Sequence, residues 1–343
     1  MTIARRVRRA YNLSMNIRPW ILTSLLGLLL VGCAPDAILI KPISTTAGLK
    51  ERTVGGDTGW LVSNKIAVID VDGLITNQRE AGFLGMEDNP TSLFIEKLDR
   101  VTADEDVRAV VLRINSPGGG VTASDIMYHA LRKLKQRRKM PVVSIIEDVG
   151  ASGGYYLACG SDKILAHPTS VVGSIGVIIQ TFSFAGTLNM LGANTQAIKS
   201  GKYKDMGSPL KPLSEDDARV FQNVVDDLYQ RFLRVVDKGR PGMSAEDVAS
   251  VADGKIFTAQ EALDNGLIDA IGYMDDAISL ARKQAGIEKA RIVMYSRPYG
   301  SRPHVYAEAA DLPTTQFNMI NLDIPSLTDL TRPRVMYLWN GRQ

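Results

Sequence analysis

The sequence has only two cysteines and three histidines among its 343 residues. Two cysteines cannot form the dense disulfide framework on which many small secreted domains depend. No group of cysteines and histidines has the spacing of a zinc site, and the chain lacks the G-x-x-x-x-G-K-S/T loop that cradles nucleotide phosphates. We therefore expect neither a metal ion nor another cofactor.

Acidic residues are absent from residues 1–32, which carry five arginines. The whole chain has a formal net charge of +3, but the remainder contains 35 basic and 37 acidic residues, a net charge of −2. A near-neutral body offers no electrostatic attraction for DNA or RNA. We therefore expect no nucleic-acid partner.

The arginines precede a short apolar run, "WILTSLLGLLLVGC", in the order that is typical of a bacterial export signal. The run is too short, and too closely followed by polar chain, to favour a membrane-spanning helix. It ends in Leu30-Val31-Gly32-Cys33, which resembles the lipobox of bacterial lipoproteins. That resemblance implies an acylated Cys33 and a lipid-anchored protein of the bacterial cell envelope, facing the periplasm or the exterior. An uncleaved signal anchor is the alternative.

The rest of the chain indicates one large α/β domain. Residues 33–61 mix proline, glycine and charge without periodicity and are interpreted as a membrane tether. From residue 62 to 290 the pattern is strand, glycine turn, helix, strand, which predicts βα units and a mainly parallel sheet. Within it, a strand is expected to lead into the loop that begins near Lys199, and a long helix begins at Ser214. Residues 291–343 are interpreted as a C-terminal extension.

Three glycine-rich turns could carry chemistry: "NSPGGG" at 115–120, "GASGG" at 150–154 and "KSGKYKD" at 199–205. Each also has an ordinary interpretation. The first could be a plain turn between a strand and a helix, Ser152 in the second could only cap a helix, and the lysines of the third could simply be solvated.

Taken together, the turns indicate a function far more specifically than each does alone. The series "NSPGG", "ASGGYY", "VGSIGV" and "SGKYKD", in this order and at these separations, resembles the signal peptide peptidase A (SppA) family, the membrane-linked serine–lysine proteases of bacteria. The resemblance covers residues 62–290 in a single copy, so the chain looks like the short form of the family. It implies a crotonase/ClpP-like spiral of βα units with long helices.

The resemblance also assigns roles to residues. It implies that Ser152 is the nucleophile and Lys204 the general base, with Lys199 and Lys202 as competing candidates within the same loop. It implies that Gly119 and Gly153 supply the N–H groups of an oxyanion hole and that Ser174 orients the lysine. It further implies hydrophobic peptide substrates, such as released signal peptides, and a homo-oligomeric ring, because a single copy leaves the site incomplete without its neighbours.

Serine and lysine suffice chemically for such a site. A serine hydroxyl needs a base to become a nucleophile, and an amine can serve once it has lost its proton. With an ordinary pKa near ~10.4, only about one lysine in 2,500 is neutral at pH 7. Burial disfavours the charged ammonium, so it lowers the pKa of a lysine and raises the fraction that is neutral at pH 7. Unlike histidine, lysine needs no third residue to fix a tautomer, and serine–lysine variants of the triad are known.

The sequence therefore predicts a membrane-anchored serine endopeptidase that works through an acyl-enzyme. Two other functions stay open: a crotonase-type acyl-thioester enzyme, and a lipoprotein that binds peptides without cutting them. A histidine base, with His167 oriented by Asp148, is a further alternative to the lysine.

Overall fold

The computed structural model describes residues 48–343 except for 79–80, 83–84, 87–88, 298–333 and 340–343. The predicted signal and the lipid attachment residue Cys33 lie outside the described residues. No helix within the described ranges is long and apolar enough to cross a membrane.

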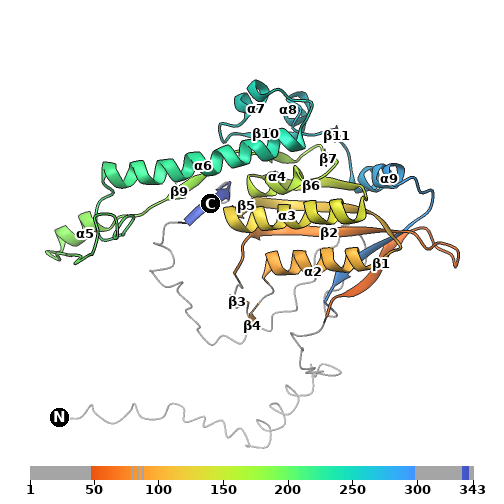
Figure 1. Ribbon diagram of the computed structural model, residues 1–343, viewed down its shortest axis with the longest axis horizontal. Coiled ribbons are helices and arrows are strands. Elements are labelled where there is room, and N and C mark those ends of the chain that lie inside the picture. The colour runs from red at the N-terminus through yellow and green to blue at the C-terminus, as the bar shows by residue number, and fades with distance from the viewer. Residues whose placement is uncertain (1–47, 79–80, 83–84, 87–88, 298–333, 340–343) are drawn as a thin grey trace, which may run out of the picture. The chain divides into compact units, whose positions relative to one another are not determined.

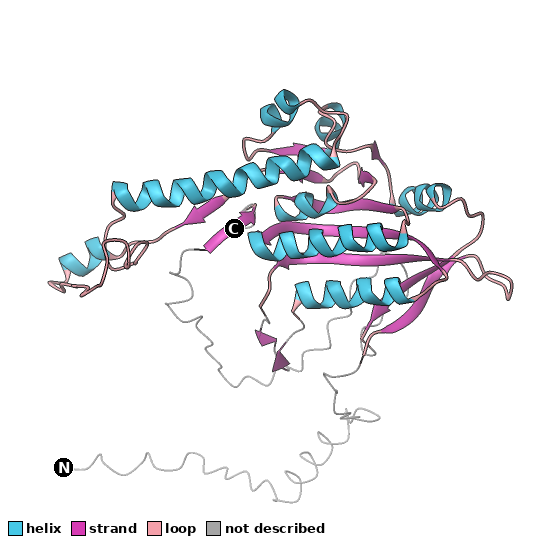
Figure 2. Cartoon of the chain, in the orientation of Figure 1, coloured by secondary structure: helices cyan, strands magenta, loops and turns pink. Residues whose placement is uncertain are grey.

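A large mixed sheet forms the centre of the fold and confirms the predicted α/β class (Figures 1 and 2). Five parallel strands make its core, and in spatial order these are β12 (Arg291–Ser296), β2 (Lys65–Ile75), β5 (Val107–Gly120), β6 (Val142–Ala151) and β7 (Lys163–Ala166). The edges carry β1 (Lys50–Gly56), antiparallel to β12, and β11 (Ala270–Ile271), parallel to β7. Runs of β-branched residues such as "VRAVVLRIN" suit strands that are buried on both faces.

Side chains that alternate along these strands build a separate apolar core on each face of the sheet. On one face, Ile69 and Leu112 join a core with the helices α2 (Pro90–Ala103), α3 (Val121–Arg138) and α4 (Gly153–Ala158). On the other face, Val68 and Val111 pack with the helix α9 (Met274–Gln284). With a layer of helices on either side, the sheet is rigid enough to hold the ends of its strands in fixed positions.

Smaller elements complete the described part of the chain. Ile178–Gln180 forms β9, Ala185–Met190 forms α5 and Glu215–Gly239 forms the long helix α6, which begins at Ser214 as predicted. Further elements are β3 (Ala81–Gly82), β4 (Gly85–Met86), β8 (Val171–Gly173), α7 (Ala245–Val251), β10 (Ile256–Thr258), α8 (Ala259–Asp264) and β13 (Arg334–Leu338). A capping box of Thr258 and Glu261 begins α8.

Three expectations about local structure were wrong. Residues 50–56, assigned to the tether, form β1 in the sheet, because six of these seven residues pair in register with β12 although none of their side chains is fully buried. The expected strand before Lys199 does not form, since residues 192–200 have no partner strand. The "SPGGG" turn is instead the extended end of β5, which continues to pair with β2 as far as Gly119.

One part of the domain projects beyond the central strands, and we call residues 178–224 the arm; its first strand, β9, joins the sheet through β13. It contains β9, α5, the following loop and the first part of α6, and Figure 1 shows α5 at the end of this projection, far from α4. Many of its apolar side chains are exposed, among them Phe182, Phe184, Met190, Leu191, Ile198, Leu210 and Val224. The apolar stripe of α6 is therefore buried only towards its C-terminal end, at Phe232, Val235 and Val236.

Candidate active site

Ser152 lies in a sharp turn between β6 and α4. Its backbone has φ 52° and ψ −114°, a region that residues other than glycine rarely adopt and that costs about 1–3 kcal/mol. The turn is held by the Ser152 N–H, which donates to the carbonyl of Gly173 at 2.7 Å, and by the Ser152 carbonyl, which accepts from Tyr156 N–H at 2.8 Å. The chain thus leaves a rigid strand and enters a helix within one residue.

The Ser152 side chain is buried and makes no hydrogen bond to any described residue. It does not cap α4, because no backbone N–H of the helix donates to its hydroxyl. A buried hydroxyl without a partner is a cost to stability, about 1–3 kcal/mol. A strained backbone and an unpartnered hydroxyl at one serine are typical of a site kept for chemistry rather than for the fold.

Glycines from two separate elements converge beside Ser152. A Cβ placed on Gly153 would lie 2.4 Å from Ser124 Oγ and 3.2 Å from the backbone nitrogen of Gly119. A Cβ on Gly118, which has φ 98°, would lie 2.6 Å from the backbone nitrogen of Gly153. Side chains would therefore force the end of β5 away from the start of α4. The structure brings Gly119 and Gly153 together next to Ser152, as an oxyanion hole requires.

Ser174 is also buried and also has a positive φ, 49°. It follows Gly173, whose carbonyl holds the Ser152 turn, and its own N–H donates to the carbonyl of Lys255 at 2.7 Å. Ser174 lines a hollow of about 480 Å³ that is bounded by α6 and residues 252–254. Two carboxylates, Asp226 and Asp253, lie in the same lining. Lys255 pairs with Asp253 at 3.5 Å, so the negative charge that favours a cation in the hollow is that of Asp226.

The three lysines of "KSGKYKD" differ in what they contact. Lys199 Nζ donates to Asp205 Oδ1 at 2.6 Å, and together with Lys211 it lowers the pKa of that carboxyl to about 2. Lys202 pairs with Asp216. Within the described residues, the ammonium of Lys204 has neither a hydrogen bond nor an ion pair, and the residue is exposed.

Lys204 does not lie near Ser152 in a single chain. It belongs to the loop between α5 and α6, and Figure 1 shows α5 and this loop in the part of the domain that projects away from α4. The structure therefore brings together four of the five predicted site residues, and the fifth lies on the arm with its ammonium unpaired.

The alternative histidine base finds no support in the contacts of the site. His167 packs against Tyr273, with ring centroids 5.2 Å apart, and burial lowers its pKa while Asp148 partly offsets that effect. Asp148 itself accepts a hydrogen bond from the side-chain amide of Asn115 at 3.3 Å. Because Ser152 Oγ has no hydrogen-bond partner among the described residues, His167 does not activate it here.

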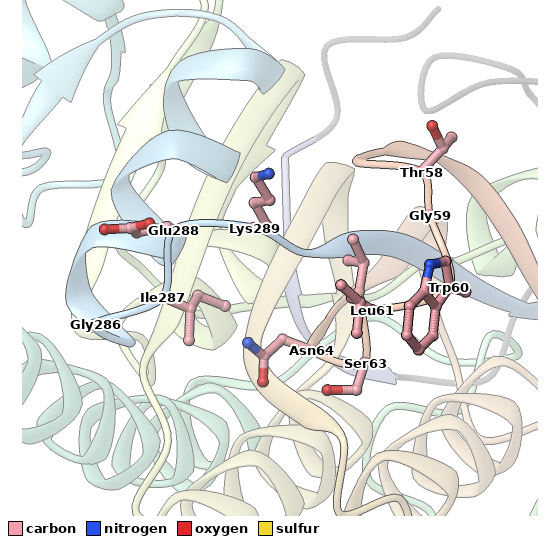
Figure 3. A pocket seen from close by; sticks show the side chains of 11 residues that line it. Thr58, Gly59, Trp60, Leu61, Ser63, Asn64, Gly286, Ile287, Glu288 and Lys289 are labelled. Atoms are coloured by element: carbon pink, nitrogen blue, oxygen red, sulfur yellow. The ribbon is translucent and has the colours of Figure 1, made fainter.

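A second hollow, of about 520 Å³, lies elsewhere on the domain (Figure 3). It is lined by the loop 58–64 between β1 and β2 and by residues 286–289. Lys65, at the amino end of β2, follows this loop, whereas Ser152 follows the carboxyl end of the parallel strand β6. The hollow therefore lies at the opposite edge of the sheet from Ser152 and holds no residue of the site.

The sequence analysis missed the position of the C-terminal strand β13. This strand pairs with the glycines 118–120 of β5 on one side and with β9 on the other. More than 200 residues separate β13 from the glycines of β5 in the sequence, and "VMYL" has the composition of an ordinary strand. No local signal could have placed it beside Ser152.

Comparison with known proteins agrees with this site. The model of Peptidase family S49 matches residues 134–288. A relative from Enterococcus faecium, whose name assigns it to the signal peptide peptidases SppA, is 37% identical over 233 residues, which are 68% of this chain and 67% of that protein. A protease-named relative from Synechocystis sp. is 34% identical over 228 residues, 66% of this chain and 77% of that protein.

A third relative, the chloroplastic serine protease SPPA of Arabidopsis thaliana, is 33% identical over 268 residues, which are 76% of this chain and 38% of that protein. The segment matched by the family model contains Ser152, Ser174 and Lys204. The chain therefore belongs to peptidase family S49, the family of SppA-type serine proteases.

Proposed function

We propose that this serine protease is an endopeptidase in which Ser152 is the nucleophile and Lys204 the general base. The observation that carries the proposal is the buried, unpartnered hydroxyl of Ser152 on a strained turn, flanked by the N–H groups of Gly119 and Gly153. Such a serine is costly for the fold and useful for acyl transfer.

The chemistry follows from these groups. The neutral lysine takes the Ser152 hydroxyl proton as Oγ attacks the substrate carbonyl carbon, and the N–H groups of Gly119 and Gly153 bind the developing oxyanion. The lysine ammonium then gives its proton to the leaving amine as the C–N bond breaks, which leaves an acyl-enzyme. Water, deprotonated by the same lysine, attacks the ester and releases the acid product and Ser152.

The base comes from a second copy of the chain. The arm carries Lys204 on an exposed loop, and the apolar side chains around it, including Ile198, Tyr203 and Leu213, are also exposed. Burying such a surface against a neighbour is favourable, at about 25 cal/mol per Å² of apolar area. The hollow beside Ser174 contains the carboxylate of Asp226, which has the charge to receive a lysine ammonium. Repetition of this contact builds a closed ring.

Mixing two inactive variants tests this arrangement. Ser152→Ala and Lys204→Ala should each abolish peptide hydrolysis, and a mixture that is allowed to exchange subunits should recover about a quarter of the wild-type activity, because random pairing leaves that share of sites intact. Lys199→Ala and Lys202→Ala are matched controls from the same loop and should keep their activity. A mixture that stays inactive although mass spectrometry detects mixed oligomers would refute a base supplied by the neighbour.

A fluorophosphonate probe tests the nucleophile independently of any substrate. It should label wild-type protein on Ser152 and leave Ser152→Ala unlabelled. An acyl-thioester enzyme or a peptide-binding protein without catalysis would not react, so absence of labelling in an assembled, folded protein would overturn the proposed protease mechanism.

The proposal extends to location and substrate. Cys33 is acylated and anchors the protein in the cell envelope, where membrane-derived hydrophobic peptides such as released signal peptides are the substrates. Two acyl chains would give a stable anchor. Labelled palmitate should enter the wild-type protein and not Cys33→Ala, and equal labelling of both would remove the lipid anchor from the proposal.

A further inference from the structure

We propose that Asn115 and Ser116 are positioning residues of the active site. Their side chains fix two irregularities in the pairing of β5, and these irregularities determine how the N–H of Gly119 lies relative to Ser152. The inference rests on the proposed function, because the groups that it positions are the nucleophile and one donor of the oxyanion hole. Neither side chain is assigned a step of the reaction itself.

The first irregularity lies between β5 and β2, just before the glycines of the site. The register of the two parallel strands skips one residue of β2, Gly73, and two residues of β5, Ser116 and Pro117. It resumes where Leu74 pairs with Gly118. Such a β-bulge interrupts the ladder of backbone hydrogen bonds and changes the direction of the strand. The bulge therefore determines where the glycines that follow it lie.

The hydroxyl of Ser116 spans this bulge. It donates to the carbonyl of Gly73 at 2.6 Å and accepts from the N–H of Gly118 at 3.1 Å. The side chain is fully buried, so a lost hydrogen bond would leave a buried polar group without a partner. One hydroxyl thus ties the skipped residue of β2 to the first glycine after the bulge, and Gly119 is the next residue along the chain.

The bulge of β5 also lies against the beginning of α4. A Cβ built on Gly154 would lie 2.8 Å from the carbonyl oxygen of Ser116, and one built on Gly118 would lie 2.6 Å from the backbone nitrogen of Gly153. At such distances neither segment can move towards the other. The hydroxyl that holds Gly118 therefore also sets how the N–H of Gly119 lies relative to the turn that carries the nucleophile.

The second irregularity lies on the other side of β5. Between Ile146 and Gly150, β6 has three residues opposite the single residue Asn115 of β5. The side chain of Asn115 holds these extra residues, because it accepts from the N–H of Val149 at 3.2 Å and donates to Oδ2 of Asp148 at 3.3 Å. The nucleophile follows two residues after Gly150, so Asn115 helps to set the point at which β6 delivers it.

Positioning of this kind acts on the transition state more than on substrate binding. The oxyanion forms only when Oγ attacks, and an N–H donor stabilises it best at about 2.7–3.1 Å. A displacement of about 1 Å can cost about 10²-fold in rate. Loss of either side chain should therefore lower kcat and leave KM nearly unchanged, whereas a purely structural role would lower stability alone.

Ser116→Ala in the full-length protein tests the first bulge. We expect kcat for a peptide substrate to fall about 10²-fold, with little change in KM. Ser144→Ala is the matched control, because Ser144 is also fully buried and its hydroxyl shares a hydrogen bond of 2.6 Å with that of Ser161, near the amino end of β6. The control should lose stability and keep its kcat. Equal kcat values for the two folded variants would overturn the positioning role of Ser116.

An exchange of two side chains tests the second irregularity. Asn115→Ala should lower kcat about tenfold or more. The double variant Asn115→Asp, Asp148→Asn exchanges the amide and the carboxylate, so a carboxylate oxygen still accepts from Val149 and the amide still donates across the pair. It should recover most of the lost kcat, whereas Asn115→Asp alone brings two carboxylates together and should not. A folded double variant that is no more active than Asn115→Ala would refute the role of Asn115.

Hydrogen exchange separates this inference from the proposed protease mechanism, because it needs no turnover. Exchange of the segment that contains Gly118 is followed by mass spectrometry in Ser152→Ala protein, with and without Ser116→Ala. The added substitution should accelerate exchange there, since the N–H of Gly118 loses its acceptor, and Ser144→Ala should not. Unchanged exchange would overturn the role of Ser116. Failure of the fluorophosphonate probe to label wild-type Ser152 would instead refute the proposed function.

Discussion

Replacement of Ser152 by alanine distinguishes a serine kept for chemistry from a serine that merely begins a helix. The hydroxyl is buried and has no hydrogen-bond partner in the described part of the chain. Removing such a group relieves a desolvation cost of about 1–3 kcal/mol and leaves a void smaller than a methyl group. We therefore expect the free energy of unfolding of Ser152→Ala to exceed that of wild type by about 1 kcal/mol.

The glycine variant extends the same reasoning to the backbone. Glycine accepts φ 52° without strain, so Ser152→Gly recovers part of the cost of about 1–3 kcal/mol that the serine bears. Greater freedom of the unfolded chain offsets roughly 0.5–1 kcal/mol of that gain. Both variants should therefore melt at or above the melting temperature of wild type. For a domain of this size, each kcal/mol of added stability raises the melting temperature by about 2 °C.

The assay compares melting temperature with peptide hydrolysis. Hydrolysis should fall by several orders of magnitude in both Ser152 variants, because removal of a nucleophile acts on the chemical step. A helix cap behaves in the opposite way: its loss costs about 1 kcal/mol of stability and leaves turnover largely alone.

Ser170→Ala provides a matched control. Ser170 is equally buried, but its hydroxyl donates to the carbonyl of Ile146 at 2.9 Å, so this variant should lose stability, about 1 kcal/mol, and keep its activity. The reasoning is refuted if Ser152→Ala melts as early as Ser170→Ala, or if it still cleaves peptides.

Other perturbations give further tests. Gly153→Ala places a Cβ 2.4 Å from Ser124 Oγ and should lower kcat about 10²-fold or more, whereas Gly55→Ala, which meets nothing within 4 Å, should not change kcat. Burial raises the pKa of Glu147 from 4.5 to about 7; Arg113 partly offsets this effect, and Asp72 and Asp70 reinforce it. The contribution of this carboxyl to the free energy of unfolding is therefore largest below pH 4.5 and is lost as the pH rises through 7. Glu147→Gln should therefore melt higher relative to wild type at pH 8 than at pH 5, and a difference that does not change with pH in thermal scans would contradict this.

Much of the fold around Ser152 could be predicted because its signals are local. The β-branched run before Asn115 and the next run to Val149, with a helix between them, define strand, helix and strand, and the structure contains all three, although the glycines after Asn115 extend β5 and do not form the expected turn. The proximity of Gly119 and Gly153 follows from the same pattern, because parallel neighbouring strands end at the same edge of a sheet. The predicted α/β class depended on these segments alone.

Contacts between distant segments were beyond the reach of the sequence. Residues 50–56 have few apolar side chains, and they form β1 through backbone pairing with β12, which the pattern of side chains does not encode. The long helix from Ser214 was predicted, but periodicity along it cannot reveal that Val224 stays exposed while Phe232 is fully buried. Nor could spacing alone place Lys204 at the end of the arm.

The strain and missing hydrogen bond at Ser152 and the exposed apolar side chains of the arm both cost stability, and these costs have a common physical explanation. A strained, unpartnered serine persists only where its surroundings are rigid, and here it lies between β6 and α4, which are buried in a core that covers one face of the sheet. The arm has the opposite character, since its lysine and apolar side chains lie outside that core and can be satisfied only by another surface. On the proposed mechanism, in which Lys204 reaches Ser152 only from a neighbouring chain, an isolated chain holds a nucleophile without a base. Peptide hydrolysis per subunit should therefore fall on dilution below the concentration at which the oligomer dissociates, while the melting of the core changes little. Activity per subunit that is constant across dissociation, as followed by light scattering, would place the base within the same chain.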